Sequence, residues 1–251
     1  MTDTSPRGHD FTAIVEDDPL YDARYFDQEL HRDHWFRNNA AKRELRWREV
    51  VRMLEPTADD RVLELGCAAG EHALRLAPLC RAVVGIDRAA AAIERATARA
   101  AAQGIINAEF LQLDAADLAP FANGSFDKVA AIDFVEHVDD LTLVALLREV
   151  RRVLRPAGRL AIFTPCATHY VERLKSRNFV LRQLPGHIAV RDAAAYQRLL
   201  PEGGFAIASL YFSPSTYPAA GLLDRWLWNL PMIGPLFRFR LCIVAYASAI
   251  A

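Results

Sequence analysis

Several features that would classify a protein at once are absent from this sequence. The few cysteines include no CxxC motif or other close pair, which argues against a zinc site and against a disulfide framework. This cysteine usage fits a reducing compartment, so we expect a cytoplasmic protein. The four cysteines are Cys67, Cys80, Cys166 and Cys242.

Charge of one sign and long apolar runs are also missing. The chain carries 30 Lys and Arg against 31 Asp and Glu, so no overall basicity indicates a nucleic-acid partner. There is no apolar run long enough to predict a transmembrane helix, and the polar stretch 1–10 lacks the apolar region of a signal peptide. What remains is a 251-residue chain, 52% hydrophobic, of a length expected for one domain or one domain with an appendage.

The stretch from Arg61 to Glu71 organises the rest of the chain. It predicts a short buried strand, a turn of small residues and then a helix. A strand that ends in glycines and leads into a helix lets a ligand approach the backbone and its free N–H groups. The next expected strand, 82–86, ends in Asp87, and an acid there can accept hydrogen bonds from both hydroxyls of a ribose. Together these features are typical of a nucleoside-binding site.

Two further absences narrow the choice of nucleoside. The dinucleotide fingerprint has glycines at its first, third and sixth positions, but here the third is Ala68 and the sixth is Glu71. A carboxylate beside a pyrophosphate would be repelled, so NAD is disfavoured. The chain also contains no Tyr-x-x-x-Lys pair, which opposes an NAD-linked oxidoreductase.

Strand and helix patterns alternate from residue 61 to residue 164. Strands separated by helical segments predict right-handed crossovers and a parallel sheet, with ligands bound at the carboxyl ends of the strands. A glycine or an acid follows four of these strands, at Gly66, Asp87, Asp114 and Asp133. The expected strands are 62–65, 82–86, 108–113, 126–132, 159–163, 205–212 and 239–247, and the longer expected helices are 35–54, 89–103, 139–154 and 190–200.

Four motifs resemble segments of the class I S-adenosylmethionine (SAM) methyltransferases. Val62 to Gly70 is similar to their motif I, an acid followed by G-x-G-x-G, and Val84 to Asp87 is similar to their ribose-binding motif. Residues 114–127 and 154–160 resemble the "gD…lPf…sFD" and "LkPGG" segments of UbiE- and UbiG-like enzymes. In this order and spacing, the motifs identify the chain as a member of the UbiE/UbiG-like (methyltransferase type 11) family.

The resemblance implies an α/β fold of Rossmann-like type. Its seven-stranded, mostly parallel sheet would have the strand order 3-2-1-4-5-7-6, with strand 7 antiparallel and helices on both faces. We expect residues 1–58 to form an N-terminal helical lid or cap, in which Trp35 and Phe36 either fasten the helix to the core or cover the cofactor. Residues 59–251 would form the methyltransferase domain, with acceptor-side insertions at about 165–190 and 213–238.

The resemblance also implies which residues bind SAM. Asp87 would hold the ribose, and Asp114 would accept from the adenine amino group, unless either acid is only a helix cap or a turn residue. Glu64 would lie near the amino group or the helix end, or would be a buried carboxylate that caps a neighbouring loop. Ala68, where the family often has glycine, fits only with a negative φ and slightly tightens the pocket. The expected set is Glu64, Gly66, Cys67, Ala68, Gly70, Asp87, Arg88, Asp114, Ala115 and Ile132.

The segment after the fourth strand, 132–138, lacks the N/D-P-P-Y sequence of methyltransferases that modify nucleobase or glutamine amines. It resembles the acid-x-x-Glu-His-Val segment of UbiG-like O-methyltransferases, in which two acids and a histidine can bind a divalent metal. Asp133, Glu136 and His137 are therefore weak metal candidates, better suited to Mn²⁺ or Zn²⁺ than to Mg²⁺, although we expect no metal. His137 is the catalytic candidate, as a general base for a phenol or hydroxyl; it is otherwise a structural histidine or a metal ligand.

The divergent segments face the acceptor. Residues 222–237 mix aliphatic side chains with Trp and Arg, which predicts either an amphipathic lid packed on the sheet or an apolar acceptor channel with peripheral membrane contact. We expect five nearby polar residues to face the acceptor or to be solvated. They are His169, Tyr170, Arg173, His187 and Arg191.

These features predict a SAM-dependent methyltransferase with a small or lipophilic acceptor. O-methylation of a hydroxylated metabolite or quinone-like compound is favoured, because the segment after the fourth strand resembles that of O-methyltransferases. The alternatives are C-methylation of UbiE type, a SAM-binding partner subunit without catalysis, and the NAD-linked oxidoreductase that the turn already disfavours.

Overall fold

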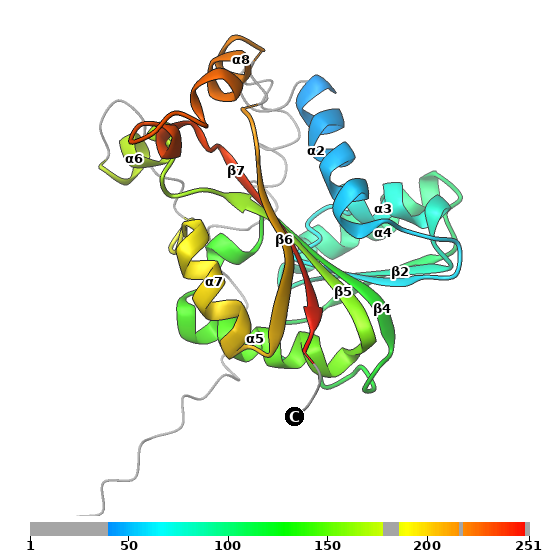
Figure 1. Cartoon of the computed structure of the whole chain (residues 1–251). Helices are drawn as coiled ribbons and strands as arrows, with labels where there is room; N and C mark the ends of the chain where they lie inside the picture. Colours follow the sequence, from blue (N-terminus) through cyan, green and yellow to red (C-terminus); the bar gives the residue numbers. More distant parts are fainter. Residues whose placement is uncertain (1–39, 178–185, 216–217, 249–251) are drawn as a thin grey trace, which may run out of the picture.

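A single seven-stranded sheet forms the centre of the computed structural model, which describes residues 40–177, 186–215 and 218–248 (Figure 1). The strand order is β3-β2-β1-β4-β5-β7-β6, and only β7 runs antiparallel to its neighbours. This confirms the predicted fold class. The strands are β1 (Arg61–Leu65), β2 (Ala82–Asp87), β3 (Ala108–Gln112), β4 (Phe126–Ile132), β5 (Leu154–Pro165), β6 (Phe205–Ser213) and β7 (Arg240–Ala247).

Helices cover both faces of the sheet. Alternate residues of β1 show how each face is buried: Val62 belongs to one apolar layer, and Leu63 and Leu65 belong to the other. Residues of α2 and α3 complete the first layer, and residues of α5 and α7 complete the second. The helices are α2 (Ala40–Leu54), α3 (Glu71–Leu76), α4 (Ala90–Ala102), α5 (Asp140–Val153), α6 (Tyr170–Ser176), α7 (Ala193–Glu202) and α8 (Pro218–Leu227), with 3₁₀ turns η1 (Ala77–Leu79), η2 (Val135–His137) and η3 (Gly234–Phe237).

Local chemistry explains where the element boundaries differ from the predicted ones. Helix α7 begins at Ala193 rather than at 190, because the Asp192 side chain caps it by accepting a hydrogen bond from the Ala195 amide. The segment predicted to be irregular contains α6, which begins after His169. Strand β5 begins at Leu154, which pairs with Phe126 across a register shift, five residues before the predicted start at 159.

The carboxyl ends of the parallel strands meet at one edge of the sheet. Gly66 follows β1, Asp87 ends β2 and Asp133 follows β4. Because β7 is antiparallel, its first residue, Arg240, lies at this same edge, opposite Pro165 at the end of β5. The fold therefore gathers groups from five strands at one edge, where a ligand is expected in an open α/β sheet.

Helix α8 lies beyond the ends of β6 and β7 (Figure 1). Its outer side exposes apolar side chains: Leu222 is 70% exposed and Trp226 is 76% exposed. No helix within the described residues has both the length and the hydropathy that a membrane crossing needs. Peripheral membrane contact through 222–237 stays a prediction, as do the proposed domain limits, and Trp35 and Phe36 lie outside the described residues.

Candidate cofactor and acceptor site

The turn after β1 is built from left-handed residues. Gly66, Ala68 and Gly70 have φ values of 64°, 46° and 74°. The expectation that Ala68 keeps a negative φ is therefore wrong. In this conformation the Ala68 amide donates to Asp87 Oδ2 at 2.9 Å, which offsets a left-handed cost of about 1–2 kcal/mol for a residue with a Cβ. The turn thus holds the acid at the tip of β2 and leaves the Ala68 side chain exposed.

Gly66 is required for a steric reason as well as a conformational one. A Cβ at this position would lie 2.5 Å from Cδ2 of Phe134, which comes from the segment after β4. The Phe134 ring therefore packs directly on the turn after β1. This contact brings the residues that follow β4 alongside the glycine turn.

We expect Gly66→Ala to lower the free energy of unfolding by more than Gly104→Ala. Both glycines have a φ near 65°, but nothing lies within 4 Å of a Cβ built at Gly104. The two variants share the left-handed strain, and only Gly66→Ala adds a collision with Phe134, worth about 1–3 kcal/mol by the usual cost of overpacking. Urea denaturation of both variants measures the difference. Equal losses would show that the Phe134 ring moves aside without cost.

Asp87 occupies the position expected of a ribose-binding acid. Its Oδ2 accepts from the Ala68 amide and its Oδ1 accepts from the Ala89 amide, each at 2.9 Å. Burial raises the pKa of this carboxyl, although the two amides act in the opposite direction. Each carboxylate oxygen has a second lone pair, so Asp87 can brace the turn and still accept from ligand hydroxyls.

The adenine-side candidates follow β2 and β3. Arg88 is exposed, and its carbonyl accepts from the Gln112 side chain at 3.0 Å, which ties the two strand ends together. Asp114 is also exposed, and its Oδ1 accepts from the Ala116 amide at 2.9 Å. Asp114 is thus a turn residue here, and its role toward adenine stays a prediction. Ala115 is buried just after β3, and Ile132 is buried at the end of β4.

Glu64 is a buried acid with an unsatisfied oxygen. It is 3% exposed, its Oε1 lies 3.7 Å from Nδ1 of His72, and its Oε2 has no hydrogen-bond partner among the described residues. Burial raises the pKa of Glu64 to about 8, and the charges of Glu71 and Asp87 act in the same direction. Burial lowers the pKa of His72 to about 4, so this histidine is neutral at pH 7. A cationic ligand group beside Glu64 would satisfy the orphaned oxygen.

These features fit a nucleoside with a cationic tail. The edge of the sheet provides a hydroxyl acceptor at Asp87, a glycine turn that exposes backbone, and a buried carboxyl at Glu64. SAM carries a ribose, an ammonium and a sulfonium, and it has no phosphate that these acids would repel.

On the acceptor side, Asp133 is engaged in ion pairs. Its Oδ1 accepts from Arg240 at 2.5 Å, and its Oδ2 lies 3.2 Å from Nη2 of Arg46. Burial opposes ionisation, but the two guanidinium groups prevail and lower the pKa of Asp133. The carboxylate therefore joins α2, β4 and β7, and the structure does not bring it into one cluster with Glu136 and His137 as a metal-binding group.

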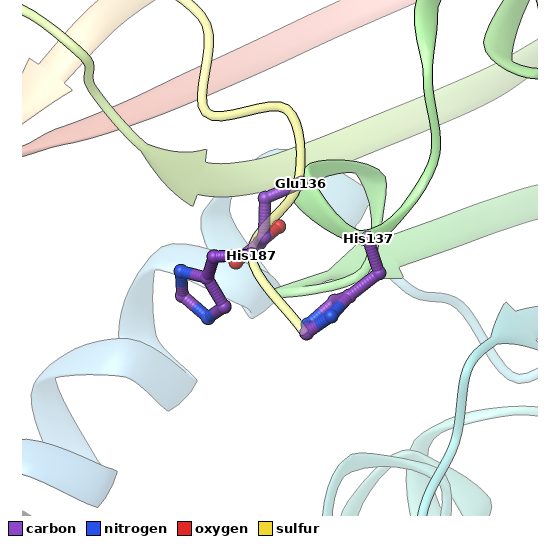
Figure 2. A group of neighbouring side chains, drawn as sticks. All are labelled: Glu136, His137 and His187. Carbon is purple, nitrogen blue, oxygen red and sulfur yellow. The ribbon is translucent and has the colours of Figure 1, made fainter. Parts of the chain in front are cut away.

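Glu136 and His137 converge instead with His187, which comes from the segment before α7 (Figure 2). His137 Nδ1 lies 2.7 Å from the Gly186 carbonyl oxygen, and its ring packs edge-on against His187 with centroids 5.0 Å apart. A carbonyl oxygen can only accept, so Nδ1 donates and the neutral imidazole carries its lone pair on Nε2. Burial lowers the pKa of His137, and burial together with the His137 charge lowers the pKa of His187 to about 4.

Glu136 is fully buried within this cluster. Thr164 Oγ1 donates to its Oε2 at 3.0 Å, whereas its Oε1 has no hydrogen-bond partner among the described residues. Burial, followed by the negative charge of Asp133, raises the pKa of Glu136 to about 8. At pH 7 this carboxyl therefore holds its proton unless a positive charge arrives nearby.

Arg191 fastens the two segments that form the cluster. This side chain, 5% exposed, donates to the carbonyls of Val135 and Val138 at 2.7 Å each and forms a 2.7 Å bond to Oδ1 of Asp140. The Ala189 amide also donates to the Glu136 carbonyl at 3.0 Å. Arg191 is thus a positioning residue, and the expectation that it faces the acceptor or solvent is wrong.

Sequence reasoning named His187 only as an acceptor-facing or solvated residue, and it overlooked Arg46, Phe134 and Arg240. His169, which carried the same expectation, is fully buried beneath α8 and lies 3.5 Å from Asp224. Phe134 occupies a variable position of the segment 132–138, and the other residues lie in no motif. Their partners are more than 45 positions away in the sequence, so no local pattern could reveal them.

Comparisons with known proteins agree with this geometry. A family model described as "Methyltransferase domain" matches residues 56–207. The 27-O-demethylrifamycin SV methyltransferase of Amycolatopsis mediterranei (strain S699) is 32% identical over 249 residues, covering 92% of this chain and 88% of that protein. The O-methyltransferase resE of Aspergillus sclerotiorum is 33% identical over 166 residues, covering 64% of this chain and 60% of that protein.

A solved structure supports the fold alone. It is geranyl diphosphate C-methyltransferase from Streptomyces coelicolor A3(2), in complex with Mg²⁺, geranyl diphosphate and S-adenosyl-L-homocysteine. Its TM-score is 0.61 at 17% identity, and the match covers 90% of this chain and 84% of that one.

Proposed function

Because this chain belongs to the methyltransferase domain family and is a SAM-dependent methyltransferase, we propose that it methylates a hydroxyl oxygen of a small organic molecule. Two relatives support an oxygen acceptor, since one is named for a 27-O-demethyl compound and the other is named an O-methyltransferase. The UbiE/UbiG-like subfamily stays a prediction.

The observation that carries the proposal is the link from the glycine turn through Phe134 to His137. Phe134 packs on Gly66, and the His137 amide donates to the Phe134 carbonyl at 3.0 Å, so one short turn of backbone joins His137 to the residue that touches the glycine turn. The ring is neutral at pH 7 and carries a lone pair on Nε2. A hydroxyl that loses its proton becomes a better nucleophile, and a positioned base contributes about 10²–10⁴-fold.

In this proposal one set of residues binds the cofactor, and His137 activates the acceptor. Asp87 would accept from the ribose hydroxyls of SAM, Glu64 would pair with its ammonium group, and the turn from Gly66 to Gly70 would support the nucleoside. SAM supplies an electrophilic methyl group on a sulfonium when it is bound. His137 takes the proton of the acceptor hydroxyl, and Gly186 holds the imidazole in the tautomer that does so.

The proposal is tested with SAM that carries a ¹³C-labelled methyl group. Purified protein is incubated with a panel of hydroxylated acceptors that includes 27-O-demethylrifamycin SV, catechols and quinols. We expect a product with a ¹³C methoxy signal. A labelled methyl on carbon would replace the proposal with C-methylation, and SAM binding without product from any acceptor would favour a non-catalytic partner subunit.

We expect the binding of S-adenosylhomocysteine (SAH) at pH 7 to release about 0.5–1 proton, because its ammonium group favours the ionised form of Glu64. The ligand-free carboxyl, with a pKa of about 8, is mostly protonated at this pH. Affinity should therefore rise as the pH approaches 8 and then level off. Calorimetry in buffers of different ionisation enthalpy measures the protons, and Glu64→Gln should remove the release. Heats that do not depend on the buffer would contradict this role of Glu64.

A further inference from the structure

The cluster of Glu136, His137 and His187 has the composition of a metal centre. One carboxylate oxygen and one nitrogen from each imidazole lie within 4.8 Å of one another. Tetrahedral ligands bound at about 2.1 Å are separated by about 3.4 Å, so ligand atoms within 4.8 Å of one another need to approach by at most about 1.4 Å. Figure 2 shows them coming from two separate segments of the chain.

Two buried atoms in this cluster are unsatisfied. Oε1 of Glu136 and Nδ1 of His187 have no hydrogen-bond partner among the described residues, and Glu136 is fully buried. A buried carboxyl oxygen without a donor is costly, and a cation would compensate it. The orphaned atoms therefore indicate a ligand and not only a packed interior.

The surroundings also resemble the outer shell of a metal site. Ligating histidines usually donate their second N–H to a backbone carbonyl, as His137 does to Gly186 at 2.7 Å. Ligating carboxylates are themselves hydrogen-bonded, as Glu136 is by Thr164. Arg191 joins the two segments without entering the cluster, because its nitrogens donate to Val135, Val138 and Asp140. Hydrogen bonds thus hold the Glu136 and His137 donors in place before any ion arrives.

We propose that Glu136, His137 and His187 bind one divalent transition-metal ion, such as Zn²⁺ or Mn²⁺, at the acceptor side of the site. Two imidazoles and one carboxylate are donors that suit these ions better than Mg²⁺. Asp133 is not a ligand in this assignment, because Arg46 and Arg240 occupy both of its oxygens. The two arginines neutralise the charge of Asp133. Ionised Glu136 is then the carboxylate that faces the ion.

The metal has a role in the reaction only if the proposed function is correct. Three protein ligands leave a coordination position open, as in catalytic zinc sites. An acceptor hydroxyl at that position would be oriented and made more acidic, in the way that zinc lowers the pKa of water to about 7. With the ion bound, His137 would act as a ligand in place of the base role proposed above, and the proton of the acidified hydroxyl would leave to solvent.

The test uses tag-free, chelator-treated full-length protein titrated with Co²⁺ alone and with Zn²⁺ alone. We expect one ion per chain and, for Co²⁺, visible absorption typical of a low-coordinate site with nitrogen ligands. His187→Gln, which changes a half-buried loop residue, and Glu136→Gln should each weaken binding by at least about 100-fold, since loss of outer-shell partners alone costs 10–100-fold. Glu202→Gln, at an exposed glutamate, is the matched control and should leave binding within about threefold.

Asp133→Asn separates the two possible ligand sets. If Asp133 replaced His187 as a ligand, Asp133→Asn would abolish binding and His187→Gln would not, which would overturn the proposal. Failure of the wild-type protein to bind either ion would also overturn it. SAH binding, measured on the same metal-free samples, tests the proposed function separately: SAH binding without metal binding rejects only the metal centre, and metal binding without SAH binding rejects only the methyltransferase assignment of this site.

Discussion

Asp87→Ala is expected to weaken the binding of SAM and SAH by about 1.5–3 kcal/mol, which corresponds to roughly a ten- to 150-fold loss of affinity. The variant removes a charged acceptor for ribose hydroxyls. It also removes the partner of the Ala68 amide, in the left-handed turn after β1, and of the Ala89 amide, at the start of α4. Calorimetric titration with SAH, with NAD as a parallel ligand, measures the change.

Asp117→Ala is the matched control for this experiment. Asp117 is an exposed aspartate whose Oδ1 accepts from the amide two residues later, at 3.1 Å, as Oδ1 of Asp87 does at 2.9 Å. It shares the local turn role but does not end a strand at the ligand edge. We expect the control to bind SAH like the wild type. If Asp87→Ala folds and binds SAH with unchanged affinity, Asp87 is only a turn residue.

His137→Ala is expected to reduce kcat by about 10²–10⁴-fold and to leave SAH affinity nearly unchanged, whether the imidazole acts as a base or as a ligand. The residue lies on η2, next to the glycine turn but outside the cofactor residues, so a loss confined to kcat would locate its role at the acceptor. Single-turnover assays with a saturating acceptor measure kcat separately from binding.

His169→Ala provides the contrasting result. His169 is fully buried, and its Nδ1 accepts from the Val171 amide at the start of α6. We expect His169→Ala to lower the thermal unfolding temperature, and we expect the folded fraction to retain kcat. If His137→Ala instead unfolds the protein, as a structural histidine would, the catalytic assignment of His137 fails.

Most of the sheet could be predicted from the sequence, because its signals are local. The run from Val62 to Leu65, the strand that ends in Asp87, and the strand from Phe126 to Ile132 are short apolar segments bounded by turn residues. The strand order came from the family resemblance and is confirmed. Boundaries were less certain where a side chain decided them, as Asp192 does at the start of α7.

The acceptor side could be predicted only in part, because its geometry depends on distant partners. Asp133, Glu136 and His137 lie within five consecutive positions of the sequence and suggest one group of ligands. In the structure, Arg240 is paired with Asp133 across 107 positions, and His187 joins the other two from an irregular segment. No periodic pattern marks His187, so only the fold places it there.

The conformation of Ala68 likewise could not be predicted from the sequence, because it depends on a distant partner. The usual preference of alanine for negative φ is correct on average. Here the hydrogen bond from its amide to Asp87, 19 positions away, selects the rarer conformation. A rule about single residues could not include that contact.

The reversed direction of β7 has a consequence for how the family could diversify. The chain leaves the ligand edge at Ser213 and returns to it at Arg240, and these two residues are direct partners in the sheet, with Pro165 on the other side of Arg240. The segment between Ser213 and Arg240 therefore begins and ends at two residues that are paired side by side in the sheet. It forms an exchangeable cassette: recombination at its two ends could transplant acceptor preference between relatives while the strand tips that hold the cofactor stay as they are.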